Sequence, residues 1–170
     1  MVRLVLFDID GTLIQTGGAG VRAFDRAFEL EFDIADASRE FSFAGRTDTG
    51  LLNDFFTAHK LPSSDENHSR FFNSYVHWLD HYMSDSKGDM LPGVIHLLNE
   101  MLALPERPVI GLLTGNIRLG AQIKLRHHDL WNFFETGAFG CEHADRNEIA
   151  RIALRRGGQM FGQDLSGDEL

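Results

Sequence analysis

The chain has 170 residues, of which 43% are hydrophobic and 24% charged, and its formal net charge is −9. This length and composition suffice for one domain with a sizeable hydrophobic core, and the 14 phenylalanines argue against disorder. The acidic balance disfavours nucleic-acid binding, which depends on clustered lysine and arginine. No apolar run reaches the roughly 20 residues that a bilayer span needs, and the single cysteine, Cys141, excludes an intramolecular disulfide. We therefore expect a cytoplasmic protein that binds neither nucleic acid nor a membrane; its oligomeric state stays open.

The first third of the chain combines one short strand with a long helical stretch. Residues 4–7 form a continuous apolar run that ends at Asp8, which predicts a strand buried on both faces. Apolar side chains then recur at helical spacing over residues 21–32, 48–59 and 63–84. Ser63 and Glu66 have the spacing of a capping box, so the third of these helices is expected to start at Ser63. Because residues 17–87 contain helical patterns only, we interpret them as an inserted helical cap.

From residue 88 onward, predicted strands and helices alternate. The pattern predicts helices over residues 94–104, 118–128 and 146–156, and strands over residues 109–113 and 136–139. Such alternation implies right-handed crossovers and a parallel sheet. The predicted fold class is therefore α/β, with a Rossmann-like parallel sheet core in residues 1–16 and 88–170 and an α-helical cap in residues 17–87.

Two carboxylates follow the first predicted strand within the string Asp8-Ile9-Asp10-Gly11-Thr12-Leu13. Ligands of parallel sheets bind at the carboxyl ends of the strands, and residues two apart on an extended segment point the same way. Asp8 and Asp10 can therefore act on one substrate, and Gly11 allows a sharp turn beside it. A simple turn is the alternative, but the full string arises by chance in on the order of one such chain in several hundred.

This string resembles the first motif of the haloacid dehalogenase superfamily, in particular its phosphoglycolate-phosphatase-like members with a helical cap. Leu112-Leu113-Thr114-Gly115-Asn116 resembles the second motif. The resemblance implies a phosphatase that hydrolyses a small phosphorylated metabolite through an aspartyl phosphate. Asp8 would be the nucleophile and Asp10 the general acid and base. Mg²⁺ would bind the Asp8 carboxylate and the Asp10 backbone carbonyl, while Gly11 and Thr12 would contact the substrate.

Further candidates lie beyond the first motif. The Thr114 hydroxyl can donate to a phosphoryl oxygen, and the amides of Gly115 and Asn116 precede a helix, where anions bind; a helix cap is the alternative. Two cations compete for the superfamily's third motif. Arg146 begins the last predicted helix and is preferred, whereas Lys124 lies about two turns into its helix and has far to reach. Arg46, in a loop of the cap, could pair with a carboxylate or a second phosphate of the substrate.

The superfamily's fourth motif, which supplies further acidic magnesium ligands, is not found. Residues 164–170 are interpreted as the loop before a fourth strand, so the core is expected to be truncated, with an uncovered sheet edge. Weak magnesium binding, low activity and a tendency to associate are the predicted consequences. A phosphomutase of the same superfamily and a non-catalytic remnant that binds phosphorylated ligands remain the alternatives to a phosphatase.

Overall fold

The computed structural model describes residues 1–169, except the side chains of Glu40 and Asp168. The predicted strands and helices occur in the predicted order, and the structure adds two short strands, β2 and β3, that the sequence analysis did not predict. The bounds are β1 Leu4–Phe7, β2 Ile14–Gln15, α1 Ala19–Phe32, α2 Asp48–Ala58, α3 Asp65–Ser84, β3 Asp89–Met90, α4 Val94–Ala103, β4 Val109–Leu113, α5 Arg118–Arg126, β5 Thr136–Ala138 and α6 Arg146–Phe161. Short 3-10 helices cover Ala37–Glu40, Trp131–Phe133 and Gly167–Glu169.

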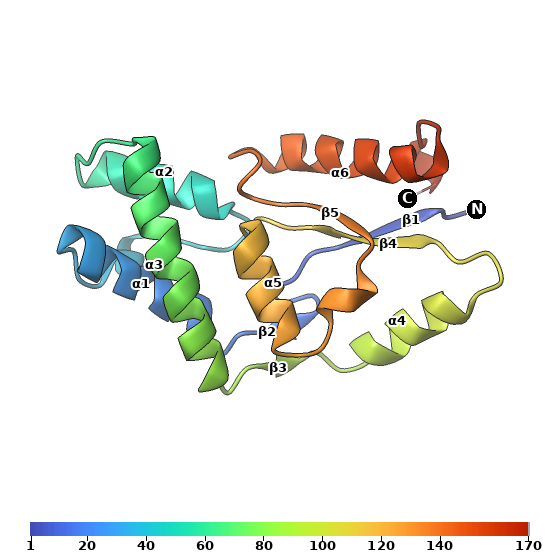
Figure 1. Cartoon of the computed structure of the whole chain (residues 1–170), viewed down its shortest axis with the longest axis horizontal. Coiled ribbons are helices and arrows are strands. Elements are labelled where there is room, and N and C mark those ends of the chain that lie inside the picture. Colours follow the sequence, from blue (N-terminus) through green and yellow to red (C-terminus); the bar gives the residue numbers. More distant parts are fainter. Residues whose placement is uncertain (170) are drawn as a thin grey trace.

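Three parallel strands form the central sheet in the order β1-β4-β5. Helix α6 covers one face of this sheet, and α4 and α5 lie on the other (Figure 1). Strand β4 is almost entirely buried, as its uninterrupted apolar sequence predicts. The α/β fold class with a parallel sheet is therefore confirmed, and the third strand is one residue shorter than predicted.

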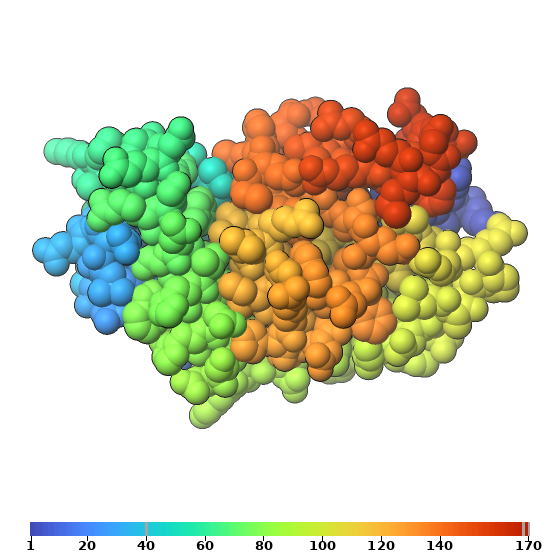
Figure 2. Space-filling view, viewed as in Figure 1, coloured from blue at the N-terminus to red at the C-terminus, as the bar shows by residue number. Residues whose placement is uncertain are grey.

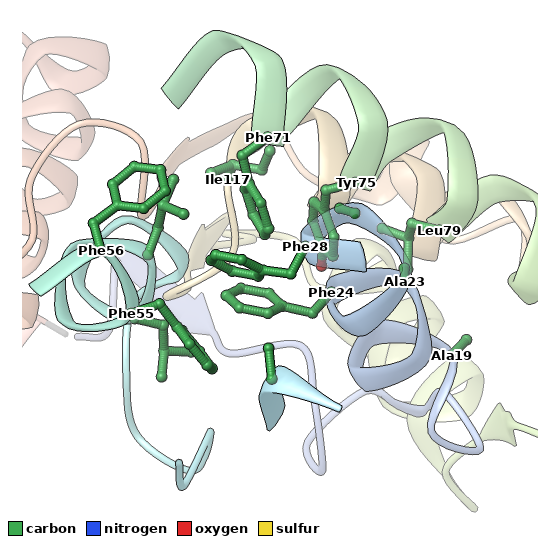
Figure 3. Close-up of a cluster of buried hydrophobic side chains, with 14 of the residues drawn as sticks. Ala19, Ala23, Phe24, Phe28, Phe55, Phe56, Phe71, Tyr75, Leu79 and Ile117 are labelled. Carbon is green, nitrogen blue, oxygen red and sulfur yellow. The ribbon is translucent and has the colours of Figure 1, made fainter. Parts of the chain in front are cut away.

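The segment between β2 and β3 is entirely helical and has its own core. Phe24 and Phe28 of α1 pack against Phe55 of α2 and Phe71 of α3, with ring centroids 4.7–5.0 Å apart (Figure 3). Strands β2 and β3 pair antiparallel, so the chain leaves the sheet region and returns to it at neighbouring points. We call residues 17–87 the helical insert. In the space-filling view the insert, coloured blue to green, occupies one end of the molecule (Figure 2).

The predicted helix ends differ from the observed ones by at most two residues, except the end of α6, which lies five residues later. Helix α3 is capped by Ser64, whose side chain accepts a hydrogen bond from the Asn67 amide, so the capping box of Ser63 and Glu66 does not form. The Ser63 hydroxyl instead donates to the Asn53 side-chain oxygen in α2 at 3.0 Å and lies 2.9 Å from the His68 ring nitrogen in α3. Helix α6 continues to Phe161, beyond the predicted end at residue 156, because its glycines allow close packing. A Cβ atom on Gly157 would lie 2.3 Å from the Leu4 side chain.

Strand β1 lies at one edge of the central sheet. Within residues 1–169 no strand pairs with its outer side, and the Arg3 amide there donates to the carbonyl of Glu169. Residues 164–169, predicted to be a loop, include a short 3-10 helix, and Leu170 lies outside the described residues. No described helix combines the length and the apolar character needed to cross a membrane.

The loop after β5 is held by an ion pair that has a testable pH dependence. The Glu142 carboxylate accepts hydrogen bonds from the Arg156 guanidinium at 2.5 and 2.8 Å and from the Phe139 amide at 2.9 Å. Burial alone would raise the pKa of Glu142, but Arg156 and the Phe139 amide lower it below its usual 4.5. The ionised carboxylate therefore stabilises the fold fully above about pH 4.5, and this stabilisation is lost as the pH falls through the lower, folded-state pKa.

We expect Glu142→Gln to reduce the free energy of unfolding at pH 7 by about 1–2 kcal/mol, a value kept small because Arg156 is partly exposed. The difference from the unsubstituted chain should shrink below about pH 4.5. Urea unfolding at several pH values measures it. Glu100→Gln, at an exposed position on α4, is the control. An equal loss at all pH values would show that the carboxylate charge is not the cause.

Candidate active site

A cavity of about 360 Å³ lies at the carboxyl ends of β1 and β4, where the central sheet meets the helical insert. The core and the insert both contribute charged side chains to its wall, and the insert adds apolar ones. The residues with polar side chains are Asp8, Asp10, Thr16, Arg46, Asp48, Tyr75, Asn116, Lys124 and Arg146. The two aspartates of the first motif therefore reach one cavity.

Asp8 forms an ion pair with Arg146 at the floor of this cavity. The Asp8 carboxylate accepts a hydrogen bond from the Arg146 guanidinium at 2.9 Å and another from the Ile9 amide at 2.9 Å. Arg146 is the first residue of α6, whose start is fixed by the Asp145 side chain accepting from the Asn147 amide. Both members of the pair keep about a third of their side-chain surface exposed. A ligand in the cavity can therefore contact them.

Asp10 is held by Lys124 and Asn116. The Lys124 ammonium donates to both carboxylate oxygens of Asp10 at 2.8 and 2.9 Å and to the Asn116 side-chain oxygen at 2.6 Å. The Asn116 amide group donates to Asp10 at 2.7 Å. Burial alone would raise the pKa of Asp10, but the charge and hydrogen bond of Lys124, together with Asn116, lower it. Asp10 therefore rests as a carboxylate.

The position of Lys124 corrects one detail of the sequence interpretation. Its ammonium group reaches the cavity although the residue lies two turns into α5. Helical side chains tilt toward the helix N-terminus, so the Lys124 stem runs back along α5 toward Asn116. Its side chain is only 5% exposed. The structure thus brings both candidate cations to the site, with Arg146 on Asp8 and Lys124 on Asp10.

The other predicted substrate-binding residues differ in their access to the cavity. Gly115 and Asn116 line it, whereas the Thr114 side chain is buried and its hydroxyl oxygen accepts from the Asn116 amide and side chain. Gly11 and Thr12 are exposed in the turn after β1 and do not line the cavity. Substrate contacts by Thr114, Gly11 and Thr12 stay predictions.

The helical insert contributes three polar side chains to the cavity wall, and Thr16 of the wall lies just before the insert. Arg46 lies just before α2 and forms an ion pair with Asp54 within that helix. Asp48, which the sequence analysis did not select, donates its backbone amide to the Gly115 carbonyl and accepts from the Ile117 amide, both at 2.8 Å. Burial raises the pKa of Asp48 to about 6, although Lys124 and the Ile117 amide oppose this rise. Tyr75, also not selected, extends from α3 into the same cavity.

Gly115 allows the insert and the core loop to approach at backbone distance. A Cβ atom on Gly115 would lie 2.2 Å from the Arg46 carbonyl oxygen, which the chain cannot accommodate without moving the loop. We expect Gly115→Ala to lower the free energy of unfolding by about 1–3 kcal/mol. Thermal unfolding measures this loss. Gly167→Ala is the matched control, since a Cβ atom there meets no atom within 4 Å. Equal melting temperatures for both variants would contradict the expected clash.

The oxygen donors at the sheet edge meet part of the requirement for Mg²⁺. This ion prefers six oxygen ligands and usually keeps several waters beside one or two carboxylates. The Asp8 carboxylate and the Asp10 carbonyl could supply two of these ligands. Among the described residues, no group of three or more histidine, cysteine, aspartate or glutamate side chains is placed to hold a metal ion. The described residues thus offer a partial set of the oxygen ligands that Mg²⁺ prefers.

The structure defines an α/β protein with a parallel sheet, two aspartates at the sheet edge and a helical insert after the first motif. The family model of the haloacid dehalogenase-like hydrolases matches residues 5–145. The chain belongs to this family.

Solved structures share this fold at low sequence identity. CbbY from Rhodobacter sphaeroides, in complex with phosphate, is 20% identical, with a TM-score of 0.72 over 91% of this chain and 72% of that one. A predicted phosphoglycolate phosphatase from Haemophilus somnus is 14% identical, with a TM-score of 0.62 over 95% of this chain and 72% of that one. A putative β-phosphoglucomutase from Thermotoga maritima is 22% identical, with a TM-score of 0.52 over 92% and 71% of the two chains. No curated protein sequence was found to match.

Proposed function

We propose that the protein is a magnesium-dependent phosphatase that hydrolyses a small phosphomonoester through an aspartyl phosphate. The observation that carries this proposal is the pairing of Asp8 with Arg146 beside a carboxylate, Asp10, in one cavity. A carboxylate nucleophile next to a fixed guanidinium can attack a phosphorus atom whose oxygens the guanidinium contacts. Family membership and the phosphate complex of CbbY support the same chemistry.

In the first step an Asp8 oxygen attacks phosphorus, and the bond between phosphorus and the leaving oxygen breaks. Asp10 gives its proton to that oxygen, so the product leaves as an alcohol. In the second step water attacks the aspartyl phosphate, Asp10 takes up the proton of the water, and inorganic phosphate leaves Asp8. Asp10 rests ionised, as the second step requires. We infer that the arriving phosphate dianion competes for Lys124 and raises the pKa of Asp10, so that it can carry the proton of the first step.

The remaining groups position the substrate. Arg146 contacts the phosphoryl oxygens while it orients Asp8, and the amides of Gly115 and Asn116 bind them from the loop before α5. Mg²⁺, when bound to the Asp8 carboxylate and the Asp10 carbonyl, would neutralise phosphoryl charge. The positive charge of the ion is needed because Arg146 and Lys124 are already paired with carboxylates and neutralise less of the phosphoryl charge. The helical insert acts as a cap that shields the cavity from water, with Arg46 toward the substrate's far end. The expected location is the cytoplasm, as the single cysteine indicates.

The test is the release of inorganic phosphate from p-nitrophenyl phosphate with and without Mg²⁺. We expect release that depends on Mg²⁺ and stops when the ion is chelated. Because the chain offers few carboxylate ligands, half-maximal activity should need millimolar Mg²⁺. If no phosphate is released at any Mg²⁺ concentration, the chain is not a phosphatase.

A phosphomutase would convert a sugar phosphate into an isomeric phosphate without releasing inorganic phosphate. Phosphorus NMR of the same reaction with a hexose phosphate distinguishes the two reactions, since the isomer and free phosphate give separate signals. Free phosphate supports the phosphatase. The isomeric phosphate alone would show that the protein is a phosphomutase rather than a phosphatase. Ligand-dependent stabilisation without either product would indicate a binding protein.

A further inference from the structure

Tyr75 lines the cavity, and its hydroxyl group has no hydrogen-bond partner in the part of the chain that the structure describes. The side chain is 3% exposed and its ring packs in the aromatic cluster of the insert (Figure 3). A Cβ atom on Gly20 would lie 4.0 Å from the Tyr75 hydroxyl oxygen and 3.7 Å from the Lys124 ammonium nitrogen, so these two groups lie near the same point of the cavity. Burial and the charges of Asp48 and Asp10 raise the pKa of Tyr75 well above its usual value, so the phenol keeps its proton.

Asp48 presents a carboxylate oxygen to the same space. One of its oxygens accepts from the Ile117 amide, and the other has no hydrogen-bond partner among the described residues. The side chain lines the cavity beside Tyr75. Asp48 is half-buried, so this oxygen is open to the cavity and can accept a hydrogen bond from a ligand.

Charge pairing distinguishes Asp48 from the other carboxylates of the cavity. Arg146 is paired with Asp8, Lys124 with Asp10 and Arg46 with Asp54. Asp48 has no such ion pair within the described residues. Its charge therefore repels a second anionic group placed beside it, whereas a hydroxyl group can donate to it.

From this juxtaposition we propose that Asp48 and Tyr75 recognise hydroxyl groups of the leaving alcohol. The preferred substrates are then phosphate esters of polyols and sugars, and esters that carry a carboxylate near the phosphate are rejected. A hydroxyl of the leaving group donates to the free Asp48 oxygen, and another accepts from the Tyr75 phenol. Selectivity thus combines an attractive contact with a repulsive one. This assignment rests on the proposed phosphatase function, because it concerns the alcohol that the reaction releases.

The experiment compares three substrates in the presence of Mg²⁺: D-ribose 5-phosphate, 2-phosphoglycolate and p-nitrophenyl phosphate. We expect kcat/KM for D-ribose 5-phosphate to exceed that for 2-phosphoglycolate by about tenfold or more. Tyr75→Phe should lower the ratio of kcat/KM for D-ribose 5-phosphate over p-nitrophenyl phosphate by about 5- to 20-fold, the effect of one or two hydrogen bonds. Tyr82→Phe, which removes the same hydroxyl from a position outside the cavity wall, should leave this ratio unchanged.

Asp48→Asn tests the effect of the negative charge while it keeps the size and shape of the side chain. The amide keeps an oxygen for the Ile117 amide but removes the negative charge, so kcat/KM for 2-phosphoglycolate should rise about tenfold relative to p-nitrophenyl phosphate. If this variant does not fold, Tyr75→Phe still decides, since it removes one atom from an intact aromatic cluster. Equal kcat/KM for the first two substrates, or an unchanged ratio in Tyr75→Phe, would overturn the assignment while leaving the phosphatase function in place.

A binding measurement decides the assignment independently of turnover. Calorimetric titration of the Asp8→Asn variant with Mg²⁺ should show D-ribose 5-phosphate binding about tenfold more tightly than 2-phosphoglycolate. If none of the three substrates releases phosphate, the proposed function fails, and this titration alone tests the recognition of hydroxyl groups. Equal affinities, or tighter binding of 2-phosphoglycolate, would overturn that recognition.

Discussion

Replacing Asp8 by asparagine should abolish the hydrolysis of p-nitrophenyl phosphate, with a loss in kcat of about 10⁴-fold or more. The amide is close to the carboxylate in size but is a poor nucleophile, and it carries no charge to pair with Arg146. Phosphate should still bind, because Arg146 is then free of its carboxylate partner. Steady-state kinetics and calorimetric titration with phosphate measure these two effects separately.

The control for this substitution removes a comparable ion pair elsewhere. Glu31→Gln breaks the pair with Arg70 in the helical insert, far along the chain from the sheet edge. This variant should retain its activity, and both proteins should unfold at similar temperatures. If Asp8→Asn keeps more than a small fraction of the activity while folded, Asp8 is not the nucleophile, and the aspartyl phosphate has to be abandoned.

Replacing Lys124 by methionine should have the largest effect on stability among the site variants. Methionine fills a similar volume, but Asp10 then keeps only Asn116 as a hydrogen-bond donor. A fully buried pair would lose about 3–5 kcal/mol when one partner is removed. The Asp10 side chain is 45% exposed, so solvent screens its charge and we expect about 2–3 kcal/mol at pH 7. The melting temperature should fall by about 4–12 °C.

The pH dependence identifies the cause of that loss. Burial is the largest influence on the pKa of Asp10 and raises it, and Lys124 is the main group that lowers it, so we expect the pKa of Asp10 to rise when Lys124 is removed. A raised carboxyl pKa costs stability as the pH rises, so the loss should be largest near neutral pH and should shrink toward about pH 4. Lys87→Met, at an exposed position of the insert, is the control and should unfold like the unsubstituted chain. A loss that does not change with pH would indicate a packing defect rather than an unpaired carboxylate.

The core strands and the first motif could be predicted from the sequence because their signals are local. Residues 4–7 and 109–113 are uninterrupted apolar runs, and each is followed directly by polar residues that the parallel sheet brings to one edge. The contact between Asp8 and Arg146 joins residues 138 positions apart and was anticipated only through the resemblance to a family. The reach of Lys124 was underestimated, because its distance along the helix was considered without the tilt of helical side chains toward the helix N-terminus.

Asp48 and Tyr75 could not be selected from the sequence because their roles depend on how two separate layers pack. At its own position Asp48 shows the pattern of a residue in the first turn of a helix, and Tyr75 shows that of a core aromatic. Both descriptions are correct locally. The close approach of the Arg46 carbonyl to Gly115 and the hydrogen bonds of Asp48 to Gly115 and Ile117 place the start of α2 against the core loop, and no periodicity in either segment encodes these contacts.

The pairing of β2 with β3 has a consequence for how such a chain can change. Gln15 and Asp89 are held side by side, so the two ends of the helical insert are fixed relative to each other whatever lies between them. Loops whose ends are close tolerate exchange and changes of length at modest cost in free energy. Exchange of the insert would leave Asp8 and Asp10 on their part of the chain, because both precede it in the sequence. New substrates can then be acquired by recombination within one segment, without rebuilding the chemistry.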